Sequence, residues 1–145
     1  MKQAIAKEIL TLVCDDIREE IGGKASLMGV YNDIVLGSLP VVLPKLSFAF
    51  ILRGIIRKFS KVDVFVTLPN EKPVKVNTID LPNIDDFIKI GETCNLYMAM
   101  VPFHIKNTGQ VKLELFFDGA EQPQVVHTFE VKVAPLPKTA HVKHS

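Results

Sequence analysis

Hydrophobic and polar positions alternate along much of the chain with a period of two residues, a pattern typical of half-buried strands. The longest example is the segment 125–133, in which every second residue from Val125 to Val133 would lie on one face. Turn-forming residues such as Asp118-Gly119 separate the alternating segments. The shorter examples are the segments 46–52, 62–68, 96–100 and 111–115. The pattern predicts a series of short antiparallel strands.

Short strands that are separated by turns indicate a sandwich or a barrel. We predict an all-β fold: a single antiparallel β-sandwich, immunoglobulin-like, over residues 1–133, followed by a flexible C-terminal tail over residues 134–145. The segment 78–93 has no clean alternation, and a short helical turn is expected around residues 84–90.

The opening segment fits two different structures. Its hydrophobic residues recur at helical spacing over residues 3–21, and Gly22 would be a natural helix stop. The same residues also fit a strand through 9–14, a charged hairpin tip and a return strand through 26–31. The periodicity leaves both structures open.

Length, charge and composition limit the kinds of partner and the cellular location expected for this protein. A chain of 145 residues fits one domain, and a formal charge of +1 argues against nucleic acid as the partner. No apolar run approaches the roughly 20 residues of a membrane span, and the first residues do not form a secretory signal. We expect a cytoplasmic protein that binds no membrane. Cys14 and Cys94 are then expected to be reduced thiols.

Residues 14–34 read CDDIREEIGGKASLMGVYNDI. This run resembles the opening signature of a family of small bacterial proteins of unknown function. Two later runs, VKLELFFDG and HTFEVKV, are similar to the carboxyl half of that family. The resemblance implies a β-sandwich and favours the hairpin over the helix at the start of the chain. It implies no activity.

The candidate site is the mixed charge around the predicted hairpin tip. Such groups contribute more to the choice and orientation of a partner than to raw affinity. The sequence thus favours a non-catalytic cytoplasmic interaction module that binds a protein partner or self-associates, without a cofactor. A solvated tip whose cations neutralise its own acids is the plainer interpretation. The expected partner-binding residues are Asp15, Asp16, Arg18, Glu19, Lys24 and Tyr31.

Two other functions use the same residues. A Ca²⁺ or small-ligand site could draw on the acidic tip, because Ca²⁺ takes six to eight oxygen ligands. A hydrolase would use two of these carboxylates, or a carboxylate with His127, in a pocket that separates their pKa values. His104 is the other titratable candidate. His141 and His144 are three residues apart, but their segment offers no further metal ligands.

Self-association has a separate signal. Ile51, Ile55 and Ile56 have no inward position in the alternation of the segment 48–56. Either another layer covers them, or they form a patch that a partner buries. A proline on each side of the segment 41–43 favours an edge strand or an extended loop there, and an edge strand can pair with a second copy.

Overall fold

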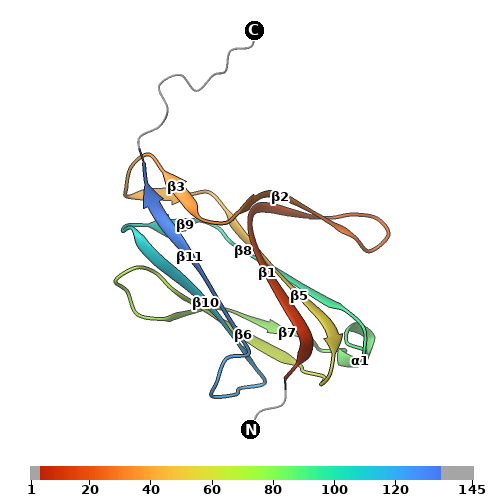
Figure 1. Ribbon diagram of the computed structural model, residues 1–145. Coiled ribbons are helices and arrows are strands. Elements are labelled where there is room, and N and C mark those ends of the chain that lie inside the picture. The colour runs from red at the N-terminus through yellow and green to blue at the C-terminus, as the bar shows by residue number, and fades with distance from the viewer. Residues whose placement is uncertain (1–3, 135–145) are drawn as a thin grey trace.

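The computed structural model describes residues 4–134 (Figure 1). These residues form eleven strands and one helical turn. Of the predicted tail only Ala134 is included, so His141 and His144 lie outside the described residues. The elements are β1 (Ala6–Glu19), β2 (Ala25–Tyr31), β3 (Ile34–Leu36), β4 (Val41–Leu43), β5 (Leu46–Ile55), β6 (Lys61–Thr67), β7 (Val74–Asp80), α1 (Ile84–Phe87), β8 (Cys94–Met100), β9 (Phe103–Ile105), β10 (Gly109–Phe117) and β11 (Val125–Val133).

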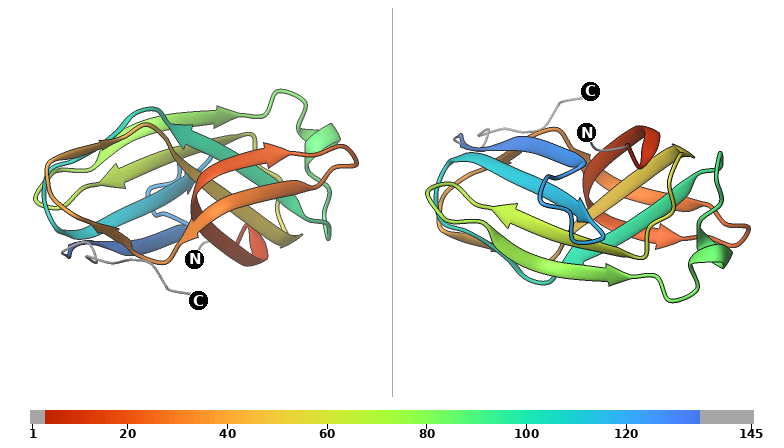
Figure 2. Two further views of the ribbon diagram at one scale, coloured as in Figure 1. Left: turned by 90° about the horizontal axis from the view of Figure 1, so that it is seen from above. Right: turned by 90° about the horizontal axis from the view of Figure 1, so that it is seen from below.

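The strands form three sheets. Sheet A has the order β2-β1-β5-β8, sheet B the order β3-β11-β10-β6-β7, and sheet C contains only β4 and β9. Sheets A and B lie on opposite sides of the molecule, and their strands cross at an angle (Figure 2). Nearly all pairs are antiparallel, but β3 runs parallel to β11.

One hydrophobic core fills the space between sheets A and B. Alternation along β5 turns Phe48 and Phe50 into this core, where both are fully buried. Sheet B contributes Val64 from β6 and Leu113 and Leu115 from β10, which are also fully buried. The predicted alternating segments therefore supply the core, because a strand with a period of two can bury one face completely.

The predicted mostly β architecture is confirmed, and so is the short helical turn, which the structure places at α1. A single antiparallel, immunoglobulin-like sandwich is not confirmed, because the strands divide into three sheets and one pair is parallel. The short segment between the two prolines is β4, which pairs with β9. Ile55 belongs to the buried core, whereas Ile51 is half-buried on the other face of β5.

The opening segment forms the β1–β2 hairpin, so the helical alternative is wrong. Eight residues of β1 between Ala6 and Cys14 pair with β5, and its second half pairs with β2. This long-range pairing provides partners for the backbone N–H and C=O groups and buries Val13. These tertiary interactions outweigh the helical spacing of the segment. The strand continues to Glu19, beyond the predicted end at residue 14, so the hairpin tip is the segment 20–24.

Candidate functional site

The far half of the β1–β2 hairpin, residues 15–29, extends past the rest of sheet A, and we call it the arm. The pairing of β1 with β5 ends at Cys14 and Ser47. From Asp16 to Glu19, the described pairing of β1 is with β2 alone. Figure 1 shows the arm as a two-stranded ribbon that projects from the body of the molecule.

The base of the arm is fixed by Asp15, Gly29 and Tyr31. Gly29 has a φ of 68°, a conformation that glycine adopts without strain. A Cβ atom at this position would lie 2.2 Å from Oδ2 of Asp15. The other carboxylate oxygen of Asp15 accepts a hydrogen bond of 2.5 Å from the Tyr31 hydroxyl. The absence of a side chain at position 29 therefore makes room for the carboxylate that binds Tyr31.

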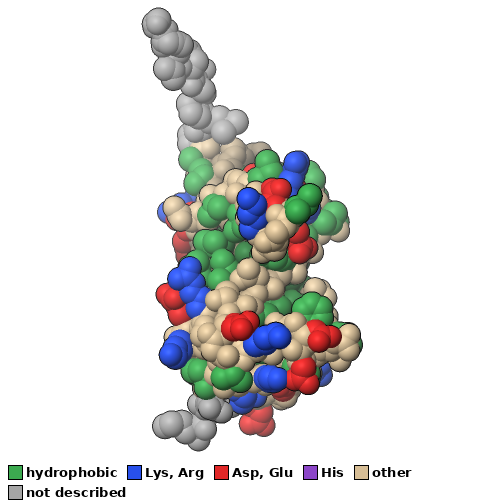
Figure 3. Space-filling view, turned by 90° about the vertical axis from the view of Figure 1, so that its right-hand side faces the viewer, with side chains coloured by type: hydrophobic (Ala, Val, Ile, Leu, Met, Phe, Trp, Pro, Cys, Tyr) green, Lys and Arg blue, Asp and Glu red, His purple; other side chains and the backbone are tan. Residues whose placement is uncertain are grey.

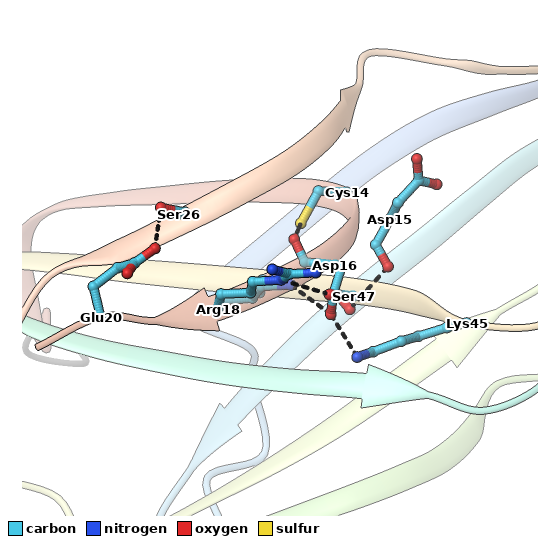
Figure 4. A network of polar contacts seen from close by, with 9 residues as sticks. Cys14, Asp15, Asp16, Arg18, Glu20, Ser26, Lys45 and Ser47 are labelled. Carbon is cyan, nitrogen blue, oxygen red and sulfur yellow. Dashed lines mark hydrogen bonds and ion pairs between the residues drawn. The ribbon is translucent and has the colours of Figure 1, made fainter.

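Asp16 binds a different set of groups. The Lys45 ammonium group donates to Oδ1 of Asp16 at 2.5 Å, and Nε of Arg18 lies 3.7 Å from Oδ2. The hydrogen bond from Lys45 is the main cause of a lowered pKa at Asp16. In Figure 4 the side chains of Asp15 and Asp16 point in different directions. The two neighbouring acids thus hold the arm through separate contacts rather than forming one carboxylate pair.

The base of the arm also contacts the outer face of sheet A. Ser47 lies on the face of β5 that points away from the core, yet only 2% of it is exposed. Its hydroxyl donates to the Asp15 carbonyl at 3.4 Å. A pocket of about 200 Å³ separates Ile17 and Glu19 of the arm from Tyr97 and Ala99 of β8. The arm therefore contacts β5 at its base and faces β8 across this pocket.

The tip presents an exposed hydrophobic residue among charges. The backbone closes with a 2.7 Å hydrogen bond from Glu20 to the Lys24 carbonyl, and Ser26 donates to the Glu20 carboxylate at 2.7 Å. Gly22 and Gly23 take positive φ angles in the turn. Ile21 is 98% exposed. Figure 3 looks onto this side of the molecule, where charged and hydrophobic side chains mix on the upper part and hydrophobic ones gather in a hollow below.

The six sequence-predicted site residues all lie in the arm or at its base, but they do not form one cluster. Asp15 binds Tyr31, and Asp16 binds Lys45 and Arg18. Arg18, Glu19 and Lys24 are exposed. Sequence reasoning did not include Ile21 among the site residues, because the candidate site was chosen by its charges. Its position directly before Gly22-Gly23, with acids on the other side, was the signal for an exposed turn.

The two histidine candidates lie away from the arm, whereas Cys14 directly precedes it. His104 is exposed on β9, and His127 is half-buried on β11, where burial lowers its pKa. Cys14 and Cys94 are buried free thiols, and burial raises the pKa of both. Within residues 4–134 there is no group of three or more His, Cys, Asp or Glu residues that could hold a metal ion.

A hollow of about 640 Å³ lies at loops remote from the arm and includes Ser60, Lys61 and Asp118. Oδ1 of Asp118 accepts hydrogen bonds from the backbone N–H groups of Ser60 at 2.9 Å and Lys61 at 3.1 Å. This carboxylate joins the two loops, which is a structural role. No helix in the described part of the chain is long and apolar enough to cross a membrane.

The Tyr31–Asp15 contact predicts a titration at high pH. Partial burial, and then the adjacent Asp15 carboxylate, raises the pKa of Tyr31 from 10.0 to about 12. Because the folded-state pKa is raised, this contribution to stability is complete below about pH 10 and is lost as the pH rises through 12. Phenolate absorbance should therefore show a component with a midpoint near 12 that disappears in Tyr31→Phe. If that component titrated near 10, Tyr31 would not be bound to Asp15.

Comparison with known proteins gives a family and no activity. No curated protein and no solved structure matches the chain at a significant level. The model of one family, described as a family of unknown function (DUF6941), matches residues 9–132. This span runs from the first half of β1 to one residue before the end of β11 and includes the whole arm. The resemblance to a family of unknown function is thereby confirmed, and the chain belongs to the family DUF6941.

Proposed function

We propose that this protein is a non-catalytic interaction module that recognises a protein partner through the arm. One observation carries the proposal: the arm holds Ile21 almost fully exposed at its tip, next to the exposed charges of Glu19 and Lys24. A large hydrophobic side chain that is surrounded by mixed charge is suited to contact another protein. The apolar group supplies affinity, and the charges supply orientation.

The contacts at the base of the arm support this function by limiting its freedom. Tyr31 binds Asp15 on one side, and Lys45 binds Asp16 on the other. A binding element that is already ordered loses less conformational entropy when it docks. Within the predicted site, we therefore assign the direct partner contacts to Arg18, Glu19 and Lys24, with Ile21 added. Asp15, Asp16 and Tyr31 position the arm.

The remaining parts of the proposal concern the cellular location and source of the protein and its fold. We propose a cytoplasmic bacterial protein, which the two free buried thiols support. We also keep the immunoglobulin-like description of the fold as a proposal, supported by two facing sheets that share one core. No catalytic role is proposed for the arm, since Asp15, Asp16 and Glu20 are engaged with Tyr31, Lys45 and Ser26, respectively.

Replacing Ile21 with serine tests the proposal directly. Full burial of an isoleucine side chain contributes about 1.5–3 kcal/mol, so we expect the amount of co-purifying partner to fall at least about tenfold. The measurement is quantitative mass spectrometry of proteins that co-purify with the tagged chain from its own cells. The double variant Arg18→Glu with Lys24→Glu should lose a similar amount of co-purifying partner, because it reverses the charge at two exposed positions of the arm.

The matched control is Val35→Ser on β3, which removes an exposed hydrophobic residue far from the arm tip. Val35 is 58% exposed, so its replacement changes surface hydrophobicity without touching the arm. We expect Val35→Ser to keep the wild-type partners. Retention of the same partners by both arm variants would contradict the proposed function.

A further inference from the structure

The long sheet edges of this protein differ in how they are protected against pairing with another chain. Natural proteins protect such edges with charges, bulges, prolines or very short strands. Edge strand β7 carries Lys75 and Asp80, and its pairing with β6 contains a register shift. Edge strand β2 also carries no charged residue, but it contains Gly29 at a positive φ, where its pairing with β1 is interrupted. Neither of these edges is therefore paired without interruption along its whole length.

Edge strand β8 has none of these features. Its seven residues, CNLYMAM, include no charged residue, proline or glycine. All seven pair with β5 in one unbroken register, from Cys94 with Leu52 to Met100 with Leu46. In the described part of the chain, no strand pairs with the other edge of β8. The backbone N–H and C=O groups on that edge therefore form a regular row without a strand partner.

We propose that β8 pairs antiparallel with β8 of a second copy of this chain, centred on Tyr97. The two copies would then share one continuous eight-stranded sheet. In this register Tyr97 lies opposite Tyr97 of the second copy, and Leu96 lies opposite Met98. Asn95 lies opposite Ala99. Such a pairing has closed twofold symmetry, the most common arrangement of soluble homo-oligomers.

In this register, the side chains of β8 are compatible with those that lie opposite them in the second copy. Leu96 and Met98 are buried on the core side of sheet A, with exposures of 5% and 8%. In the dimer, Leu96 of one copy would contact Met98 of the other. The core-facing side of sheet A would then continue from one copy into the other. Asn95 and Ala99, which are exposed, would meet on the outer face. No two like charges oppose one another, a condition that cross-strand pairing requires.

A second copy fits this edge better than a foreign strand. Foreign partners are usually selected by charged groups and by repulsion of wrong ones, and β8 carries no charge to do either. By contrast, the arm carries the exposed charges that selection of a foreign partner needs. The two surfaces therefore have different occupants, and this inference does not depend on the proposed function of the arm.

The pairing has a consequence for the arms. A twofold axis perpendicular to the sheet keeps the outer faces of both copies on the same side. The base of each arm contacts the outer face of its own sheet, and the arm faces Tyr97 and Ala99 across the pocket. The dimer would therefore present two arms on one surface. A partner with two matching sites would bind such a dimer more tightly than a single arm.

Charge substitutions at Asn95 and Ala99 test both the pairing and its register. Asn95→Lys with Ala99→Lys places two lysines opposite each other, twice per dimer, through the symmetry. Asn95→Glu with Ala99→Lys differs at one position only and places a glutamate opposite a lysine instead. Static light scattering and sedimentation equilibrium measure the mass and the dimer dissociation constant, and circular dichroism confirms that each variant is folded.

We expect the wild type to have twice the 16.1 kDa mass of the chain. The lysine–lysine variant should raise the dimer dissociation constant at least about tenfold, and the glutamate–lysine variant should keep the wild-type value or lower it. Val74→Lys with Asn77→Lys adds two positive charges to β7, an edge strand of sheet B, and should leave the dimer intact. Ile21→Ser should also leave it intact, which separates this test from that of the arm.

Three results would overturn the inference. One is a monomeric wild type at every concentration. Another is a lysine–lysine variant that dimerises as well as the wild type. The third is a glutamate–lysine variant that dissociates as much as the lysine–lysine variant, because a self-paired β8 must be rescued by opposite charges in this register.

Discussion

Replacing Phe48 with alanine is expected to lower the free energy of unfolding by about 3–5 kcal/mol. Phe48 lies at the centre of sheet A, between Val13 of β1 and Met98 of β8, and is fully buried. The substitution removes the hydrophobic contacts of the ring and leaves a cavity that the two sheets cannot fully close. Because a domain is stabilised by only about 5–15 kcal/mol, this loss is a large share of the total. Urea unfolding followed by circular dichroism measures it.

The control for Phe48 is Ile51→Ala, on the same strand but on the face that points away from the core. Ile51 is half-buried there. We expect its loss of stability to be less than half that of Phe48→Ala, since transfer energy scales with the apolar area that is buried. Equal losses at the two positions would mean that the core does not lie on the side of β5 that the structure assigns to it.

Gly29→Ala is expected to disturb the base of the arm. The new Cβ would adopt a positive φ and would lie 2.2 Å from Oδ2 of Asp15, so the carboxylate must leave its hydrogen bond with Tyr31. The backbone conformation alone costs roughly 1–2 kcal/mol for a residue other than glycine. Displacement of Asp15 should add about 1 kcal/mol, the typical net contribution of one hydrogen bond. Urea unfolding measures the total change.

Gly23→Ala separates the two causes. Gly23 also has a positive φ, of 78°, but nothing lies within 4 Å of the Cβ position. Its replacement should therefore cost the backbone part alone. In the double variant Asp15→Ala with Gly29→Ala, the carboxylate is already absent, so the two changes should cost less together than the sum of the single changes. Strict additivity, or equal costs for Gly29→Ala and Gly23→Ala, would contradict the contact between positions 15 and 29.

Long alternating segments were predictable from the sequence, whereas the pairing of the short strands was not. The segment 125–133 became β11 with its predicted bounds, because nine residues are enough to reveal a period of two. Strands β3, β4 and β9 have three residues each, too few to show a period. Their pairing divides the fold into three sheets and creates the parallel β3–β11 pair, so this part of the topology was hidden.

The candidate site was predictable as a location rather than as an arrangement. The charge density of residues 15–24 marked the hairpin correctly. The contact of Asp16 with Lys45 joins residues 29 positions apart, and no local pattern reveals such a contact. Tyr31 was included for its proximity in sequence, whereas the structure makes it the hydrogen-bond donor to Asp15. Ile21 was missed because the candidate site was chosen by its charges, and its exposure depends on where β1 ends.

The most direct test of the central claim is site-specific photo-cross-linking from the arm tip. A photoreactive amino acid is placed at position 21 in one variant and at position 35 in another. Both variants are the full chain, expressed in the cells that normally produce the protein. We predict that position 21 cross-links to the protein that co-purifies with the wild type, whereas position 35 does not. Cross-linking of that protein from position 35 but not from position 21 would contradict the assignment of the arm as the recognition surface.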